Sequence, residues 1–197
     1  MNQSPSANKA RSASDPGRIL DLAGLIGLLG KRLDDPDVHD SFVRMNLGAE
    51  PVAHVVGDAS IGESRTYFFP GAGVIVCAAD YSGAGQRIGQ LILVGKARRV
   101  YLDGQEYAVE TFRGALPLSL RWGQSRADIL RRLGCPAMSN EGISISDRPK
   151  TPIQETRDAD EFLQAGVIVR LIYSDLYKGP SCLVEIDLQR TIGPGQK

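Results

Sequence analysis

The clearest hydrophobic pattern in the chain is a short helical one between residues 126 and 133. Its apolar positions follow the spacing of one helix face and are Ile129, Leu130 and Leu133. Ser125 is a favoured N-cap residue, and Asp128 can reach back toward it in the manner of a capping box. Gly134 suits the left-handed position after a helix, and Pro136 prevents its continuation. The pattern therefore predicts a short, well-capped helix with a structural role.

Two further helices are predicted near the N-terminus, and each opens with an Asp-Pro pair that supplies an N-cap and a first helical residue. The first opens at Asp15–Pro16, and its apolar stripe continues to Leu33. Glycines interrupt this stripe at about 1 kcal/mol each relative to alanine. They make sense if another segment packs closely against them or if the helix ends near Gly30. The second helix opens at Asp35–Pro36, and its buried face consists of Val38, Phe42 and Met45.

In the middle of the chain the pattern changes to short runs of β-branched and aromatic residues separated by turn residues. The predicted strands are 66–69, 73–79, 88–94, 100–102 and 107–109. Asp103–Gly104 suits a two-residue turn of type I′. With that turn, Leu102 faces Gln105 and Val100 faces Tyr107, so the apolar residues of both strands share one face. This register predicts an antiparallel meander.

The pattern is weaker after the central helix. Residues 137–160 are polar and contain prolines, which favours a loop with one short strand near 143–145. Apolar runs then predict strands at 165–173 and 181–188.

An internal repeat is visible in these strands. The motif AGVIV occurs at 72–76 and again at 165–169. Each copy is followed by Tyr-Ser, a glycine-containing turn and another strand, QLILV at 90–94 or VEIDL at 184–188. Together with the helices that precede each set of strands, this order indicates a duplicated unit.

The predicted fold class is α+β, with two tandem helix-plus-antiparallel-sheet repeats whose sheets are expected to join side by side into one curved surface. Each sheet should carry helices on the one face that is apolar. The predicted boundaries are a disordered tail at 1–16, a first repeat at 17–111, a second repeat at 112–192 and a frayed C-terminus at 193–197.

Charge and composition narrow the choice of partners. Lysine plus arginine equals aspartate plus glutamate, 23 of each, so no net field favours nucleic acid or an anionic membrane. No apolar run approaches the roughly 20 residues that span a bilayer, and the first residues lack the apolar core of a secretory signal. The cysteines are odd in number and never occur as Cys-x-x-Cys, which favours buried, reduced thiols and a cytoplasmic protein.

Candidate catalytic groups are few. The histidines are His39 and His54, and no Gly-x-Ser-x-Gly elbow is present. The acids at 34–40 beside His39 are explained by the positive end of a helix dipole rather than by a metal. A second acidic cluster fits a solvated turn and consists of Asp158, Asp160 and Glu161. We therefore expect no catalytic residues, no metal and no cofactor.

A resemblance emerges from the segment around the central helix, FRGALPLSLRWGQSRADILRRLGCP at 112–136. From Gly114 to Pro136 it matches the phrase G-x-LP-x-x-L-x-x-G-x-SR-x-x-(V/I)-x-x-x-LG-x-P. This phrase resembles one found in bacterial immunity-type proteins of polymorphic toxin systems. The layout over residues 20–190 is similar to the tandem repeats of beta-lactamase inhibitory proteins. The short distance between Leu118 and Ser125 departs from that layout, so the second half is expected to have only one full helix.

The resemblance implies a non-enzymatic, cytoplasmic immunity protein that blocks the active site or substrate surface of a cognate protein toxin. Aromatic residues that anchor interfaces are the candidate binding residues, namely Tyr81, Tyr107, Trp122, Tyr173 and Tyr177. Two alternatives stay open. One is a small hydrolase-like enzyme on an α+β scaffold, which a buried titratable pair in a deep pocket would favour. The other is a structural module that forms a homodimer through a sheet edge.

Overall fold

The computed structural model describes residues 20–45, 47, 52–58, 62–80, 85–102, 105–145, 155–174 and 182–190. Several predicted features lie outside these residues and stay predictions: the tail at 1–16, the helix start at Asp15–Pro16, the turn at Asp103–Gly104 and the C-terminus at 193–197.

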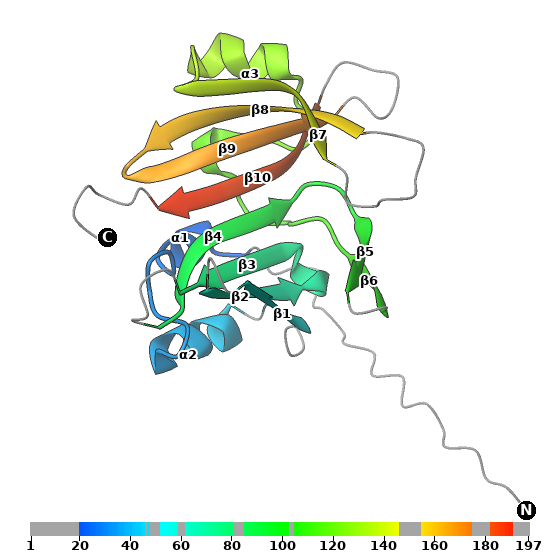
Figure 1. The fold of residues 1–197 in the computed structure, drawn as a ribbon. Coiled ribbons are helices and arrows are strands. Elements are labelled where there is room, and N and C mark those ends of the chain that lie inside the picture. The colour runs from blue at the N-terminus through cyan, green and yellow to red at the C-terminus, as the bar shows by residue number, and fades with distance from the viewer. Residues whose placement is uncertain are drawn as a thin grey trace, which may run out of the picture.

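Most of the described chain is antiparallel sheet (Figure 1). The strands of the larger, eight-stranded sheet are, in spatial order, β1 (Val52–Asp58), β2 (Gly62–Phe69), β3 (Val74–Ala79), β4 (Arg87–Val94), β10 (Cys182–Arg190), β9 (Val167–Ser174), β8 (Glu155–Gln164) and β7 (Met138–Ile145). The first four strands and the last four therefore each form a meander. The two meanders meet where β4 pairs with β10, from Val94 opposite Glu185 to Gln90 opposite Gln189.

A separate two-stranded sheet consists of β5 (Arg98–Leu102) and β6 (Gln105–Val109). Its register places Val100 opposite Tyr107 and Leu102 opposite Gln105, which confirms the predicted hairpin pairing. One face of this hairpin packs on the larger sheet in a small apolar cluster. The buried members of that cluster are Phe68, Ile75, Val94 and Val109.

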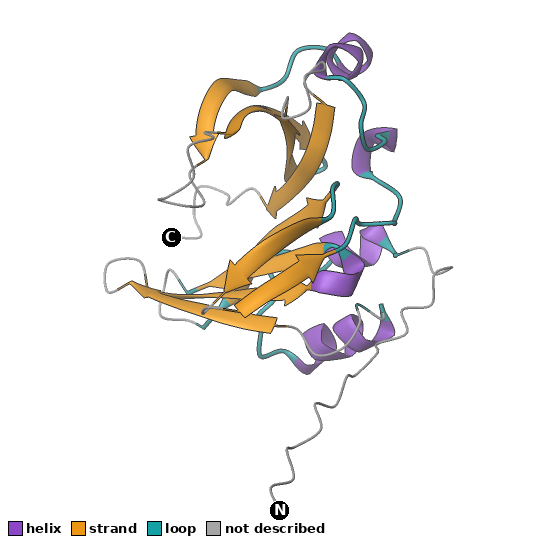
Figure 2. Ribbon diagram, turned by 90° about the vertical axis from the view of Figure 1, so that its right-hand side faces the viewer, coloured by secondary structure: helices purple, strands orange, loops and turns teal. Residues whose placement is uncertain are grey.

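The helices are few and short, and Figure 2 shows them on one side of the sheet. They are α1 (Leu22–Ile26), α2 (Pro36–Arg44) and α3 (Arg126–Leu133), with 3-10 turns η1 (Pro70–Ala72) and η2 (Pro117–Ser119). The main core lies between these helices and the sheet, and includes Leu25, Val38, Val76, Leu91, Ile129, Leu171 and Ile186. Among the described residues, no helix has the length and apolar character needed to cross a membrane.

The predicted caps of α2 and α3 are confirmed. Asp35 accepts a hydrogen bond from the backbone N–H of Asp37, and Pro36 is the first helical residue. Ser125 Oγ accepts from the backbone N–H of Asp128 at 3.2 Å and donates to its carboxylate at 2.7 Å. Gly134 ends α3 with a positive φ of 83°. The described part of the second half contains one full helix, as expected from its short approach to Ser125.

The helix predicted to reach Leu33 was wrong in extent, because α1 ends at Ile26. The backbone after it pairs with the start of β4 instead: Gly30 N–H donates to Ile88 O at 2.7 Å, and Ile88 N–H donates to Lys31 O at 3.0 Å. Gly30 has a φ of 83°, and a Cβ on it would lie 2.5 Å from the Arg190 guanidinium. A positive φ and a crowded site both require glycine there. The glycine pattern thus marks a close-packed chain reversal.

The short strand predicted near 143–145 is confirmed as part of β7, but the loop predicted for the rest of 137–160 was wrong at 138–142 and 155–160. These residues form β7 and the first part of β8, which pair with each other and, through β8, with β9. The polar composition indicated a solvated segment, but polar side chains on one face of these strands contact Arg126 of α3.

Candidate functional site

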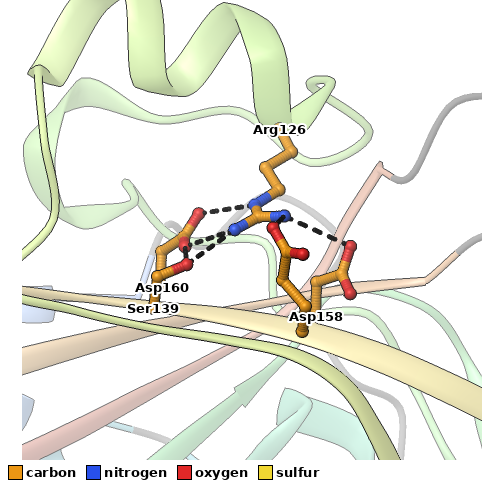
Figure 3. Close-up of polar contacts among 5 residues, drawn as sticks. Arg126, Ser139, Asp158 and Asp160 are labelled. Carbon is orange, nitrogen blue, oxygen red and sulfur yellow. Dashed lines mark hydrogen bonds and ion pairs between the residues drawn. The ribbon is translucent and has the colours of Figure 1, made fainter.

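Arg126, the first residue of α3, reaches down onto β8 and binds the carboxylate of Asp160 in a bidentate manner (Figure 3). Its Nε and Nη2 atoms lie 2.9 Å from Oδ2 and Oδ1 of Asp160, respectively. Asp160 is fully buried. Ser139 on β7 completes the contact, since its Oγ donates to Asp160 Oδ1 and accepts from Arg126 Nη2, both at 2.7 Å. This contact therefore links helix α3, the edge strand β7 and the inner strand β8.

Further groups surround the same guanidinium. Glu141 and Asp158 lie 3.1 Å and 3.5 Å from Arg126 Nη1, and the ring of Tyr173 lies 5.9 Å from the guanidinium carbon. Burial raises the pKa of Asp160, but hydrogen bonds from Arg126 and Ser139 outweigh it and hold that pKa below its ordinary value. The pKa of Arg126 is raised in turn, chiefly by its hydrogen bond to Asp160.

This geometry gives the Arg126 group a structural role. Every carboxylate oxygen of Asp160 has a donor, and a bidentate arginine pair of this kind is strong and directional. It also corrects the expectation that Asp158, Asp160 and Glu161 form a solvated turn. They lie in a strand, and Asp160 is among the least exposed residues of the protein.

A second charged group lies on the opposite face of the sheet. Along β10, Ile186 and Leu188 point into the main core, so the alternating residues Glu185 and Asp187 point to the other face. Both acids are nevertheless buried, at 6% and 5% exposure. They lie at the line where the two meanders join, with Glu185 opposite Val94 of β4.

Arginines from three other strands surround this pair of acids. Arg98 Nη1 of β5 lies 2.7 Å from Glu185 Oε2, and Arg157 Nη1 of β8 lies 3.8 Å from Glu185 Oε1. Arg170 of β9 is the cross-strand neighbour of Asp187 and donates from Nε to Glu161 Oε1 at 2.7 Å. We call the set the seam cluster; it consists of Gln90, Arg98, Arg157, Glu161, Arg170, Glu185 and Asp187.

Asp187, like Glu185, has one carboxylate oxygen that is buried without a hydrogen-bond partner. Gln90 Nε2 donates to its Oδ2 at 3.1 Å, whereas Oδ1 is buried without a hydrogen-bond partner. Burial, and then the neighbouring charge of Glu185, raise the pKa of Asp187 to about 7. Arg170, Gln90 and Arg98 act in the opposite direction but do not cancel these effects. At neutral pH the charged and the protonated form of this carboxyl are therefore both populated.

The three aromatic candidates that the structure describes do not form one surface. Tyr81 and Tyr177 lie outside the described residues. Tyr173 is fully buried, so it cannot anchor a partner in this conformation, which corrects its proposed role. Trp122 packs against Gly95 and its Nε1 donates to Phe112 O at 2.9 Å, which is an interior role. Tyr107 is half-buried on β6 and donates its hydroxyl to Gln105 at 2.8 Å.

The remaining candidate chemistry is sparse in the part of the chain that the structure describes. No three of its histidine, cysteine, aspartate and glutamate residues gather so that they could hold a metal ion. Asp35 serves as the α2 cap. The three cysteines are free thiols, but Cys135 is exposed and Cys77 and Cys182 are half-buried, so the expected burial of all three is corrected.

Sequence reasoning missed the seam cluster. In VEIDL, at 184–188, acids alternate with apolar residues. In an antiparallel sheet this alternation is typical of a strand with one solvated face, so the sequence by itself does not indicate that the acids are buried. In the structure both acids are buried and need partners, which come from β5, β8 and β9.

Comparison of the chain with protein-family models, with curated proteins and with solved structures found no match.

Proposed function

We propose that this protein is a non-enzymatic immunity protein that binds a cognate protein toxin and blocks its active site or substrate surface. The observation that supports the proposal is the one-sided placement of the helices (Figure 2). The opposite face of β8, β9 and β10, which we call the open face, has no described helix on it and presents charged and apolar side chains. A broad sheet face of this kind suits a protein partner better than a small substrate.

The tandem-repeat architecture belongs to the same proposal, and the strand order supports it. The two AGVIV motifs lie at equivalent places, leading into β3 and β9, the third strand of each meander. QLILV and VEIDL lie in the fourth strands, β4 and β10, which pair with each other. A duplicated unit whose last strands pair would produce this order.

The interior packing of two aromatic candidates leads us to propose a different contact for the toxin. Trp122 and Tyr173 serve the interior, so we place the contact on the open face rather than on an aromatic set. Leu163 is 64% exposed on β8 and lies opposite Ile168 of β9, beside Arg170. An apolar pair next to an arginine is a typical composition for an interface centre.

The test is co-expression with the toxin domain encoded beside this chain. We expect growth to be restored and the toxin to co-purify at a fixed ratio. A charge-reversal variant on the open face, Arg170→Glu, should lose both effects, while Arg131→Glu on the exposed side of α3 should keep them. Undiminished killing in the presence of the wild-type chain, with both proteins folded, would refute the proposal.

An enzyme remains the second candidate, because one observation favours it. Glu185 and Asp187 form a buried carboxyl pair, and a pKa near 7 suits general acid–base work. Against it, the free Oδ1 of Asp187 has no solvent-accessible surface, so no substrate can touch it without rearrangement. An Asp187→Asn variant that restores growth as well as the wild type would separate inhibition from this chemistry.

A further inference from the structure

On the open face, Arg98 and Arg170 each form an ion pair with a carboxylate that is less exposed than the arginine itself. The side chains of Arg98 and Arg170 are 31% and 37% exposed, whereas their partners Glu185 and Glu161 are 8% and 12% exposed. A guanidinium has five N–H donors in a fixed plane. Glu161 engages Nε and Nη2 of Arg170, and Glu185 lies against Nη1 of Arg98, whose Nε is buried without a hydrogen-bond partner. Within the described residues, the remaining terminal nitrogen of each side chain is the donor left for a group that approaches from solvent.

The charge of the seam cluster favours an anion. When Asp187 holds a proton, Arg98, Arg157 and Arg170 face only two carboxylates, those of Glu161 and Glu185, and the cluster carries one net positive charge. The other groups near Asp187 do not change this balance, since Gln90 of β4 is neutral and Cys77 of β3 is a thiol whose pKa is raised, chiefly by burial.

The two arginines are also close enough to act together. Arg170 lies opposite Asp187, and Arg98 contacts Glu185, which is two residues away on the same strand and face. The carboxylates that hold the two arginines, Glu185 on β10 and Glu161 on β8, are separated by strand β9, which places the two guanidiniums roughly 10–12 Å apart. This spacing suits the carboxylates of one short acidic segment.

We propose that the open face binds a carboxylate-bearing segment of its protein partner through Arg98 and Arg170. Glu185 and Glu161 position the two guanidiniums, and the protonation of Asp187 determines the net charge of the seam cluster. The inference rests on the proposed function in one respect, that the partner is a protein. It adds the chemistry of the partner surface, which is acidic at the point of contact, with Leu163 and Ile168 available for an apolar neighbour.

The first test uses the full chain and a fluorescein-labelled hexaglutamate peptide, with binding followed by anisotropy at about 50 mM salt. We expect saturable binding, no binding of hexalysine, and a loss of about ten-fold in affinity in the double variant R98K/R170K, which keeps the charge but loses the planar donors. Arg99→Lys is the matched control. Arg99 is the next residue on β5, is 74% exposed and pairs with Glu106 of the hairpin. An equal loss in this control would overturn the proposal, as would no binding by the wild type.

A second variant tests the role of Arg98 without leaving the carboxylate of Glu185 charged and without its arginine. R98Q/E185Q removes both charges of the Arg98–Glu185 pair, but it also takes away the carboxylate 3.8 Å from buried Arg157, so its fold is checked by circular dichroism before binding is measured. A folded R98Q/E185Q protein that binds hexaglutamate as the wild type does would contradict the assignment of Arg98.

The pH dependence of the affinity for hexaglutamate distinguishes binding at the seam cluster from nonspecific electrostatic attraction, which would not depend on Asp187. Between pH 8 and pH 6 Asp187 takes up a proton, so the affinity for hexaglutamate should rise about five-fold. Asp187→Asn should show the tighter binding at both pH values. The same pH dependence in wild type and variant would refute the role of Asp187.

A final arm separates this inference from the proposed function. If the toxin encoded beside the chain binds the wild type and R98K/R170K equally tightly, the acidic-contact proposal fails and the immunity function stands. If hexaglutamate binds as expected and that toxin does not bind at all, the immunity function fails and the anion preference of the open face stands.

Discussion

Replacing Asp187 with asparagine should make the protein more stable at high pH, because it removes a buried charge and keeps the hydrogen bond from Gln90. Asp187 is 5% exposed and lies beside Glu185. Above neutral pH the folded chain must keep a carboxylate charged in this buried place. Asparagine has the same shape, carries no charge, and can still accept a hydrogen bond from Gln90 through its amide oxygen.

The magnitude follows from linkage. Burial raises the pKa of Asp187 to about 7 from an ordinary value of 3.8. The folded state therefore binds the proton more tightly than the unfolded state, and the contribution of this carboxyl to stability falls as pH rises from about 4 to 7. At 1.36 kcal/mol per pKa unit the whole effect is about 4 kcal/mol, of which about 2 to 3 kcal/mol develops between pH 5 and pH 8.

Urea unfolding of wild type and Asp187→Asn at pH 5 and pH 8 measures this directly. The free energy of unfolding of the variant, relative to wild type, should be about 2 to 3 kcal/mol higher at pH 8 than at pH 5. Asp128→Asn is the control, because Asp128 is exposed and its pKa is lowered, chiefly by the Ser125 hydroxyl. It should gain nothing at pH 8. A stability difference for Asp187→Asn that is the same at both pH values would refute the reasoning.

Three further substitutions test the fold by thermal or urea unfolding. Arg126→Ala leaves the buried Asp160 without its partner and should cost about 3–5 kcal/mol, and a cost under about 1 kcal/mol would show that the pair is not buried in solution. Ser125→Ala removes the α3 cap and should cost about 1 kcal/mol, whereas Ser125→Asp should cost much less; equal losses would argue against capping. Gly95→Ala places a Cβ 2.3 Å from the Trp122 ring and should cost more than about 1 kcal/mol, with a shift in tryptophan fluorescence; an unchanged spectrum and stability would refute this packing.

The parts of the fold that could be predicted from the sequence are those with local causes. The limits of α3 follow from one hydroxyl at Ser125 and one glycine at Gly134. The hairpin register of β5 and β6 follows from the length of its turn. In both cases the residues that decide the structure lie within ten positions of one another along the chain.

The parts that could not be predicted depend on partners far along the chain. The end of α1 is set by pairing of Gly30 and Lys31 with Ile88, which lies more than fifty residues away. Nothing near Gly30 distinguishes a glycine within a helix from one that ends it. The seam cluster is a stronger case, because Arg98 and Glu185 are separated along the chain by β6, α3 and the first three strands of the second meander. Their charges become informative only when β4 and β10 are known to pair.

Strand β8 shows why polar composition misled the prediction for this region. Asp158 and Asp160 point to the helix side and meet Arg126, whereas Arg157 and Glu161 point to the open face and join the seam cluster. A segment charged on both faces has the composition of a solvated loop. It is stable as an inner strand because each face has opposite charges from another element, which offset the cost of removing its carboxylates from water. The same strand thus connects the Arg126–Asp160 ion pair with the arginines of the open face. Substitutions that remove the contacts of Arg126 should therefore also weaken the binding of hexaglutamate.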